Sequence, residues 1–126
     1  MKCCYGLKIF FFLMLLFTQH ANAKSPCYKL ATTAFFNSSL APTTLTPDSL
    51  KDANLEMADG ETFCKRLVQA VKTKKTTSGI MRQKADDMLK AAKGDFEHDG
   101  DMDKLELAKY HYDLVVGSAR IAEEQP

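Results

Sequence analysis

The sequence predicts an all-α protein, a small irregular bundle of four to five short helices that is stapled by one disulfide and follows a cleaved signal peptide. Apolar residues recur at helical spacing along most of the chain, and no convincing run alternates with the period of two that is typical of a strand. Two cysteines remain after the first segment is removed, as suits one covalent link in a small exported fold.

Residues 1–23 have the three parts of a secretory signal peptide. Lys2 and Lys8 give a positively charged start, residues 9–17 are an unbroken apolar run, and residues 21–23 read Ala-Asn-Ala, a small-x-small cleavage site. The apolar run is short for a bilayer and no second one follows, so we expect no transmembrane segment in the mature chain. The protein is expected to be exported, to the periplasm in a bacterium or out of the cell in a eukaryote.

The mature chain, residues 24–126, is expected to form a single helical domain. Removing residues 1–23 from the 126-residue chain leaves 103 residues, and the loss of Lys2 and Lys8 leaves 15 basic residues against 16 acidic ones, a formal charge of −1. Phosphate binding needs a clear basic excess, so this balance argues against nucleic acid as the main partner.

Cys27 and Cys64 are the two cysteines of the mature chain, because Cys3 and Cys4 leave with the signal peptide. In an exported chain such a pair most simply forms one disulfide. Closing a loop of roughly 38 residues would stabilise the fold by about 4 kcal/mol in the chain-entropy model. Two free thiols or half of a zinc site are the alternatives, but no paired cysteine or histidine lies at metal spacing near either residue.

The first half of the mature chain contains two helix starts of the same type. A serine–proline pair at residues 25–26 and a threonine–proline pair at residues 46–47 each place a capping hydroxyl before a proline at the first helical position. Residues 37–46 are rich in serine, threonine and proline and are expected to be a loop. The second helix is expected to be short, ending at Ala-Asp-Gly, residues 58–60. The apolar stripe of the first helix is Cys27, Leu30, Ala31, Ala34 and Phe35.

Three more helices are expected in the second half. The third has the clearest pattern, and residues 76–79 separate it from the fourth; the last begins at about Asp103. The apolar stripe of the third helix is Phe63, Cys64, Leu67, Val68 and Val71. The stripe of the fourth helix is Met81, Ala85, Met88, Leu89 and Ala92. The stripe of the last helix is Leu105, Ala108, Tyr112, Val115 and Ala119, with Leu107, His111, Leu114 and Ile121 on a flanking face.

An acidic segment, residues 95–106, has the layout of a calcium loop. It reads D-F-E-H-D-G-D-M-D-K-L-E, with oxygen-bearing side chains at positions 1, 3, 5, 9 and 12 and glycine at position 6. This segment resembles the loop of an EF-hand, within a helix–loop–helix at about residues 80–122. The resemblance implies one bound calcium ion. Its ligands would be Asp95, Glu97, Asp99, the backbone carbonyl of Asp101, Asp103 and a bidentate Glu106.

Two further features favour calcium. Gly100 suits a sharp bend with positive φ, and six carboxylates face one Lys104, a repulsion that a cation would relieve.

The local sequence also offers a calcium-free interpretation. The segment departs from the EF-hand pattern because Glu97 replaces the usual Asp or Asn, Gly94 precedes the loop, and no second hand is found. The alternative is a solvated acidic turn, in which Gly94 ends one helix and an Asp103-x-x-Glu start caps the next.

Other candidate features carry less information. His98 is expected to be an exposed loop residue, with a pH-sensitive neighbour of the carboxylates as the alternative, and His111 is expected to pack between aromatic residues. A basic band is expected to be a solvated helix face. Asn37 begins an Asn-Ser-Ser glycosylation acceptor if the host is a eukaryote. The basic band consists of Lys65, Arg66, Lys72, Lys74, Lys75, Arg82 and Lys84.

No nucleophile, base and acid arrangement or catalytic cysteine signature is found, so the sequence predicts a non-catalytic exported binding protein. Its acidic segment would hold one calcium ion and so shape a surface for a protein partner. The alternative is a calcium-independent inhibitor, immunity protein or accessory part of envelope machinery that binds its partner through the acidic segment. By analogy with EF-hands, which usually pair, a lone hand makes a homodimer plausible.

Overall fold

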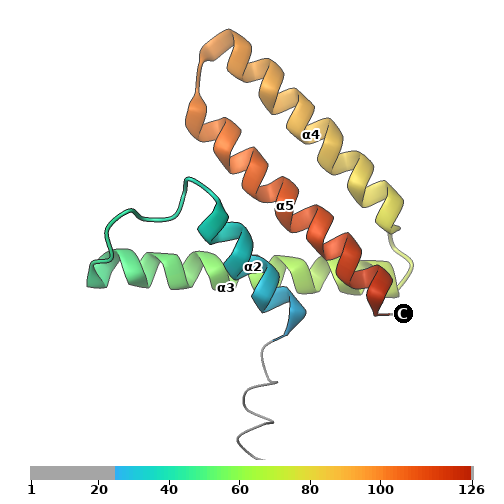
Figure 1. The fold of residues 1–126 in the computed structure, drawn as a ribbon. Coiled ribbons are helices and arrows are strands. Elements are labelled where there is room, and N and C mark those ends of the chain that lie inside the picture. Colours follow the sequence, from blue (N-terminus) through green and yellow to red (C-terminus); the bar gives the residue numbers. More distant parts are fainter. Residues whose placement is uncertain (1–24, 126) are drawn as a thin grey trace, which may run out of the picture.

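The computed structural model describes residues 25–125, which form helices joined by short connections (Figure 1). Its helices are α2 (Pro26–Asn37), α3 (Pro47–Lys72), α4 (Ser78–Asp99) and α5 (Met102–Glu124). The all-α prediction is confirmed for these residues, which contain four helices and no strand. The signal peptide predicted at residues 1–23 lies outside the described part of the chain.

The predicted starts of α2 and α3 are confirmed. The Ser25 hydroxyl accepts a hydrogen bond from the Tyr28 backbone N–H at 3.1 Å, and a proline follows the cap. Thr46 forms a capping box with Ser49, in which each side chain accepts from the other's backbone N–H. Local capping chemistry therefore fixes where both helices begin.

The prediction that residues 58–60 end a helix is wrong. α3 runs through them as one helix of 26 residues, so two predicted short helices are a single long one. Gly60 is buried, and a Cβ built there would lie 2.9 Å from the Tyr110 hydroxyl oxygen and 3.1 Å from the Ala31 Cβ. The glycine thus allows α2 and α5 to approach α3 closely, and this packing offsets the cost of about 1 kcal/mol of glycine inside a helix.

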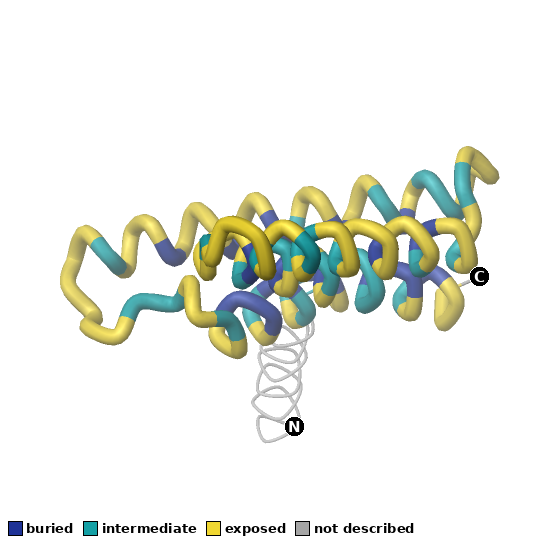
Figure 2. Tube along the Cα trace, turned by 90° about the horizontal axis from the view of Figure 1, so that it is seen from above, coloured by how far each residue is buried: buried dark blue, intermediate teal, exposed yellow. Residues whose placement is uncertain are grey.

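The core lies where α2, α3 and α5 meet, with α2 crossing α3 in Figure 1. The Phe35 and Tyr110 rings pack edge to face there, with centroids 6.3 Å apart. The N-terminal end of α3 and the connection before it are mostly exposed (Figure 2). The main cluster of buried residues is Ala31, Ala34, Phe35, Ala53, Met57, Tyr110 and Leu114.

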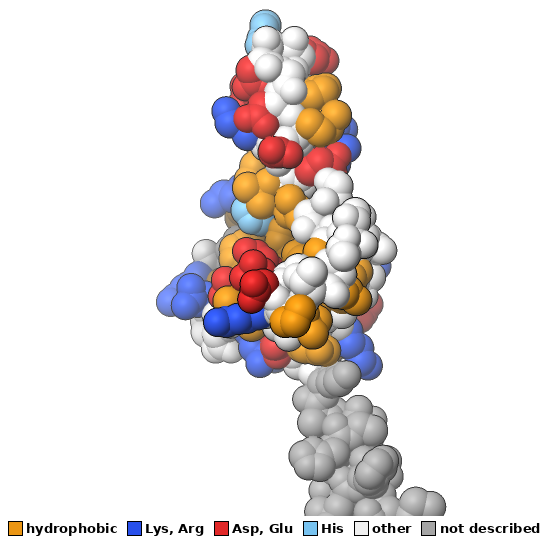
Figure 3. Space-filling model, turned by 90° about the vertical axis from the view of Figure 1, so that its left-hand side faces the viewer, with side chains coloured by type: hydrophobic (Ala, Val, Ile, Leu, Met, Phe, Trp, Pro, Cys, Tyr) orange, Lys and Arg blue, Asp and Glu red, His pale blue; other side chains and the backbone are white. Residues whose placement is uncertain are grey.

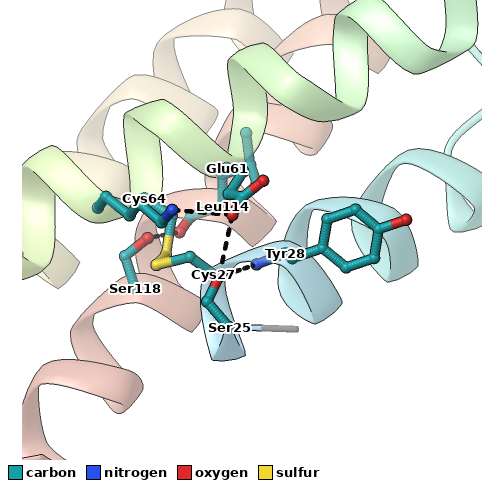
Figure 4. Close-up of a disulfide and its surroundings, with 8 residues drawn as sticks. Ser25, Cys27, Tyr28, Glu61, Cys64, Leu114 and Ser118 are labelled. Atoms are coloured by element: carbon teal, nitrogen blue, oxygen red, sulfur yellow. Dashed lines mark hydrogen bonds and ion pairs between the residues drawn. A yellow bond between two sulfur atoms is a disulfide. The ribbon is translucent and has the colours of Figure 1, made fainter. Parts of the chain in front are cut away.

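The predicted disulfide joins Cys27 of α2 to Cys64 of α3, with a Cα–Cα distance of 5.5 Å (Figure 4). Both cysteines are buried, together with Val68 and Ala122, so the covalent link lies inside a second apolar cluster. Beside it, the Ser25 hydroxyl donates to a Glu61 carboxylate oxygen at 3.1 Å. The start of α2 is therefore fixed to α3 by a covalent and a polar contact.

The buried face of α5 agrees only in part with the predicted stripe. Its core positions include Tyr110, Leu114, Ser118 and Ala122, which recur every four residues, whereas Tyr112 is only half-buried. The Ser118 hydroxyl donates to the Leu114 carbonyl at 2.5 Å, so a serine can occupy a fully buried position (Figure 4). Leu105 and Ala119 of the predicted stripe are buried as expected, whereas Tyr110, Ser118 and Ala122 were not part of the predicted set.

α4 packs principally against α5 and completes a helical hairpin. Met81 and Ala85 are buried, whereas Met88, predicted to be apolar core, is 40% exposed. The N-terminal part of α4 is therefore the better anchored end of this helix. None of the described helices is both long and apolar enough to cross a membrane.

Candidate functional site

The acidic segment, residues 95–106, forms the end of the α4–α5 hairpin, which we call the acidic tip. In Figure 1 this end projects away from α2 and α3. Acidic side chains gather on it at the top of Figure 3. Because α5 contacts α2 and α3 further along its length, the tip is held out from the core by a packed helix.

The two helices of the tip are joined by Gly100 and Asp101 alone. Gly100 is the C-cap of α4 in the left-handed region, at φ 68°, and its N–H donates to the Phe96 carbonyl at 2.8 Å. The positive φ predicted for this glycine is confirmed. The Asp101 carboxylate accepts from the Lys104 N–H at 3.2 Å and caps α5. The predicted alternative caps are wrong, since Gly94 lies within α4 and Asp103 lies in the first turn of α5.

The six predicted calcium ligands are divided between the two helices. Asp95, Glu97 and Asp99 lie in α4, Asp101 is in the turn, and the remaining two lie in α5. Positions 1 to 5 of the EF-hand-like segment are therefore helical, with Asp103 and Glu106 on the outgoing helix. Within residues 25–125, no three His, Cys, Asp or Glu side chains are grouped so that they could hold a metal ion.

Part of the tip's negative charge is already compensated. Asp99 accepts from the Asp101 N–H at 2.8 Å and lies 3.7 Å from the Lys104 ammonium. A hydrogen bond from the Ser39 hydroxyl and a second one from Lys109 lower the pKa of the Glu106 carboxyl. The Ser39 contact also connects the base of the tip to the segment between α2 and α3.

Three of the six carboxylates form no ion pair within residues 25–125 and are exposed to solvent. They are Asp95, Glu97 and Asp103. These free carboxylates occupy both helices of the hairpin, so the acidic surface includes both sides of the turn. Such a surface attracts a positively charged ligand or partner.

The two histidines of the described chain are both exposed. His98 is exposed as predicted, but it lies in the last turn of α4 and not in a loop, because the helix continues to Asp99. His111 contacts the aromatic rings of Phe63 and Tyr110, with centroid distances of 6.4 and 5.9 Å. The prediction that His111 lies next to aromatic residues is confirmed.

The basic band lies at the other end of the hairpin, on the C-terminal part of α3 and the N-terminal part of α4. Lys65 forms an ion pair with Glu61 at 2.9 Å, and Arg82 forms a two-pronged pair with Glu123. These partners are structural neighbours, which agrees with the prediction of a solvated helix face. The chain thus has an acidic end and a basic end.

Neither a protein-family model nor a curated protein nor a solved structure matches this chain.

Proposed function

We propose that this protein is a non-catalytic, exported binding protein whose acidic tip contacts a positively charged protein partner. The observation that carries the proposal is the projection of the tip from the core, with three exposed carboxylates that no basic side chain of residues 25–125 neutralises. Opposite charge on a partner would steer the encounter and set its orientation. Proteins that act in this way include inhibitors, immunity proteins and accessory parts of envelope machinery.

The structural support for the tip favours a preformed contact surface. Gly100 and Asp101 close the turn with hydrogen bonds of their own, and α5 continues from the turn into the core. A surface that is ordered before binding loses little conformational entropy when the complex forms. A partner with a basic cleft can therefore receive the tip without refolding it.

Calcium binding is the second candidate function. It is favoured by Gly100, whose left-handed conformation matches the glycine of the EF-hand pattern, and by the repulsion among six carboxylates. To wrap a cation as an EF-hand does, residues 95–99 would have to leave α4. Calcium binding in this mode therefore predicts a local helix-to-loop change.

The partner proposal is tested with two matched triple variants of the oxidised protein, used as bait on the envelope or secretory fraction of the cells that make it. The tip variant carries Asp95→Asn, Glu97→Gln and Asp103→Asn. The control variant removes the same number of charges elsewhere, by Asp52→Asn, Asp87→Asn and Glu124→Gln. We expect a captured protein to be lost by the tip variant and kept by the control. Equal capture by both variants would refute contact through the tip.

The calcium proposal is tested by calorimetric titration of calcium into the chelator-stripped protein. Saturable binding at one site, lost in Glu106→Gln, would support it, together with loss of helical NMR shifts at residues 95–99. Ser39→Ala is the matched control, because it removes the hydrogen bond to Glu106 and keeps the carboxylate. No heat up to several millimolar calcium would refute it, and capture of a partner without calcium would then identify the tip as a protein contact alone.

A further inference from the structure

A cleft of about 440 Å³ lies between α3 and α5, away from the acidic tip. Gly60, Tyr110 and Leu114 are buried residues that line it, so they form its floor. Glu56 and Asp59 contribute its acidic side. A volume of this size falls in the range of small-molecule sites.

The hydroxyl of Tyr110 has no hydrogen-bond partner within residues 25–125. The residue is 4% exposed, and its ring is fixed against Phe35. Buried polar atoms are nearly always paired, and each exception needs an explanation. A hydroxyl without a partner at the floor of a cleft is explained when a ligand supplies the missing hydrogen bond.

The charges around this hydroxyl favour a positively charged ligand. Glu56 and Asp59 have exposed side chains, form no ion pair within the described chain, and can turn towards a bound group. Burial raises the pKa of Tyr110, and the negative charges of Glu56 and Asp59, which line the same cleft, raise it further. A cation is favoured at such a position and an anion is repelled.

The remaining walls suit an organic cation better than a metal ion. Phe63 and His111 line the cleft with their ring centroids 6.4 Å apart, and the ring of a phenylalanine attracts ammonium and guanidinium groups. Arg66 lies ten residues after Glu56 in α3, on the order of 15 Å along the axis, and it makes the far end of the cleft unfavourable for a cation. The favourable position is therefore next to Glu56 and Asp59.

We propose that this cleft binds an organic cation, a guanidinium or primary ammonium group that lies between Glu56 and Asp59 and donates an N–H to the Tyr110 hydroxyl oxygen. The alkyl chain that carries the cation would lie along the aromatic wall. Because the hydroxyl is shielded from solvent in the free protein, binding includes a local movement that opens it to the cleft. The site does not depend on the function of the acidic tip.

The test is an NMR titration of the oxidised protein with n-butylguanidinium and with n-butylammonium. We expect saturable shifts at the backbone amides of Gly60, Tyr110 and His111. Tyr110→Phe should weaken binding about tenfold, since a hydrogen bond to a charged group is lost. The double variant Glu56→Gln/Asp59→Asn should weaken it by at least as much. A denaturation curve for each variant establishes that it is folded.

The matched control is Glu97→Gln/Asp103→Asn, which removes two charges from the acidic tip and should leave the affinity unchanged. Loss of binding in this control but not in the cleft variant would overturn the proposal, as would full affinity in Tyr110→Phe or an absence of saturable shifts. A capped peptide with one central arginine distinguishes the source of the cation. Binding of the peptide tenfold tighter than n-butylguanidinium indicates a partner's side chain, and weaker binding indicates a free small molecule.

Discussion

At the scale of single residues, Gly60 and Gly94 are both helical glycines in very different surroundings. A Cβ at Gly60 would lie 2.9 Å from the Tyr110 hydroxyl oxygen, whereas a Cβ at Gly94 would have no neighbour within 4 Å. We expect Gly60→Ala to destabilise the protein by about 1–2 kcal/mol, because the clash exceeds the gain in helix propensity. Gly94→Ala should stabilise it by about 0.5–1 kcal/mol. Urea denaturation of the oxidised variants measures both.

Tyr110→Phe in the Gly60→Ala background separates the clash from other effects. It removes the atom nearest to the new Cβ, so it should recover part of the lost stability, although the Ala31 Cβ at 3.1 Å still limits the space. If Gly60→Ala is as stable as the natural protein, the close approach of α3 and α5 is not a constraint on this position.

Gly60 also shows where prediction from sequence stops at this scale. Glycine is a weak helix former, and an Ala-Asp-Gly sequence is typical of a helix end, so the chain was expected to break there. The deciding contacts come from Ala31 and Tyr110, which are 29 and 50 residues away along the chain. The same limit applies to the cleft between α3 and α5, because only the fold brings Glu56 and Tyr110 together.

At the scale of helices and turns, the sequence was most informative where local chemistry decides. The Ser25 and Thr46 caps and the positive φ of Gly100 follow from side chains within a few residues, and all three were predictable. The extent of α4 was not. Residues 95–99 were expected to leave the helix, yet the helical pattern continues to Asp99, and the acidic residues lie on two helices instead of one loop.

The turn between α4 and α5 gives a prediction at this scale. Asp101 caps α5 through the Lys104 N–H, whereas Asp103 lies exposed in the first turn. Asp101→Ala should cost about 1 kcal/mol, because a helix N–H loses its acceptor. Asp103→Ala should cost less than half of that, since only a favourable interaction with the helix dipole is lost. Thermal denaturation at low salt measures the difference, and equal losses would contradict this assignment of the cap.

At the scale of the whole molecule, the disulfide and most of the core lie in one region, and the exposed acidic tip lies in another. The disulfide and the buried clusters join α2, α3 and α5, whereas α4 has α5 as its principal support. The acidic tip lies at the end of the hairpin that is farther from the disulfide (Figure 1). The cysteine pairing was predictable because only two cysteines lie beyond the predicted signal peptide, and they leave one simple choice. The arrangement of the hairpin on the core was not, because helix patterns do not specify which helices are neighbours.

This division predicts how the molecule responds when its covalent link is removed. Cys27→Ala/Cys64→Ala should lower the free energy of unfolding by about 2–5 kcal/mol, because the unfolded chain regains the freedom of a loop that spans a sequence separation of 37. Reductant should destabilise the natural protein to the same extent and leave the double variant unchanged. Hydrogen exchange should accelerate most at the buried amides of α2 and α3. Amides of the tip should change little, because we expect them to exchange through local opening. A uniform acceleration that includes the tip would show that the hairpin opens only together with the core, and that the acidic surface depends on the disulfide.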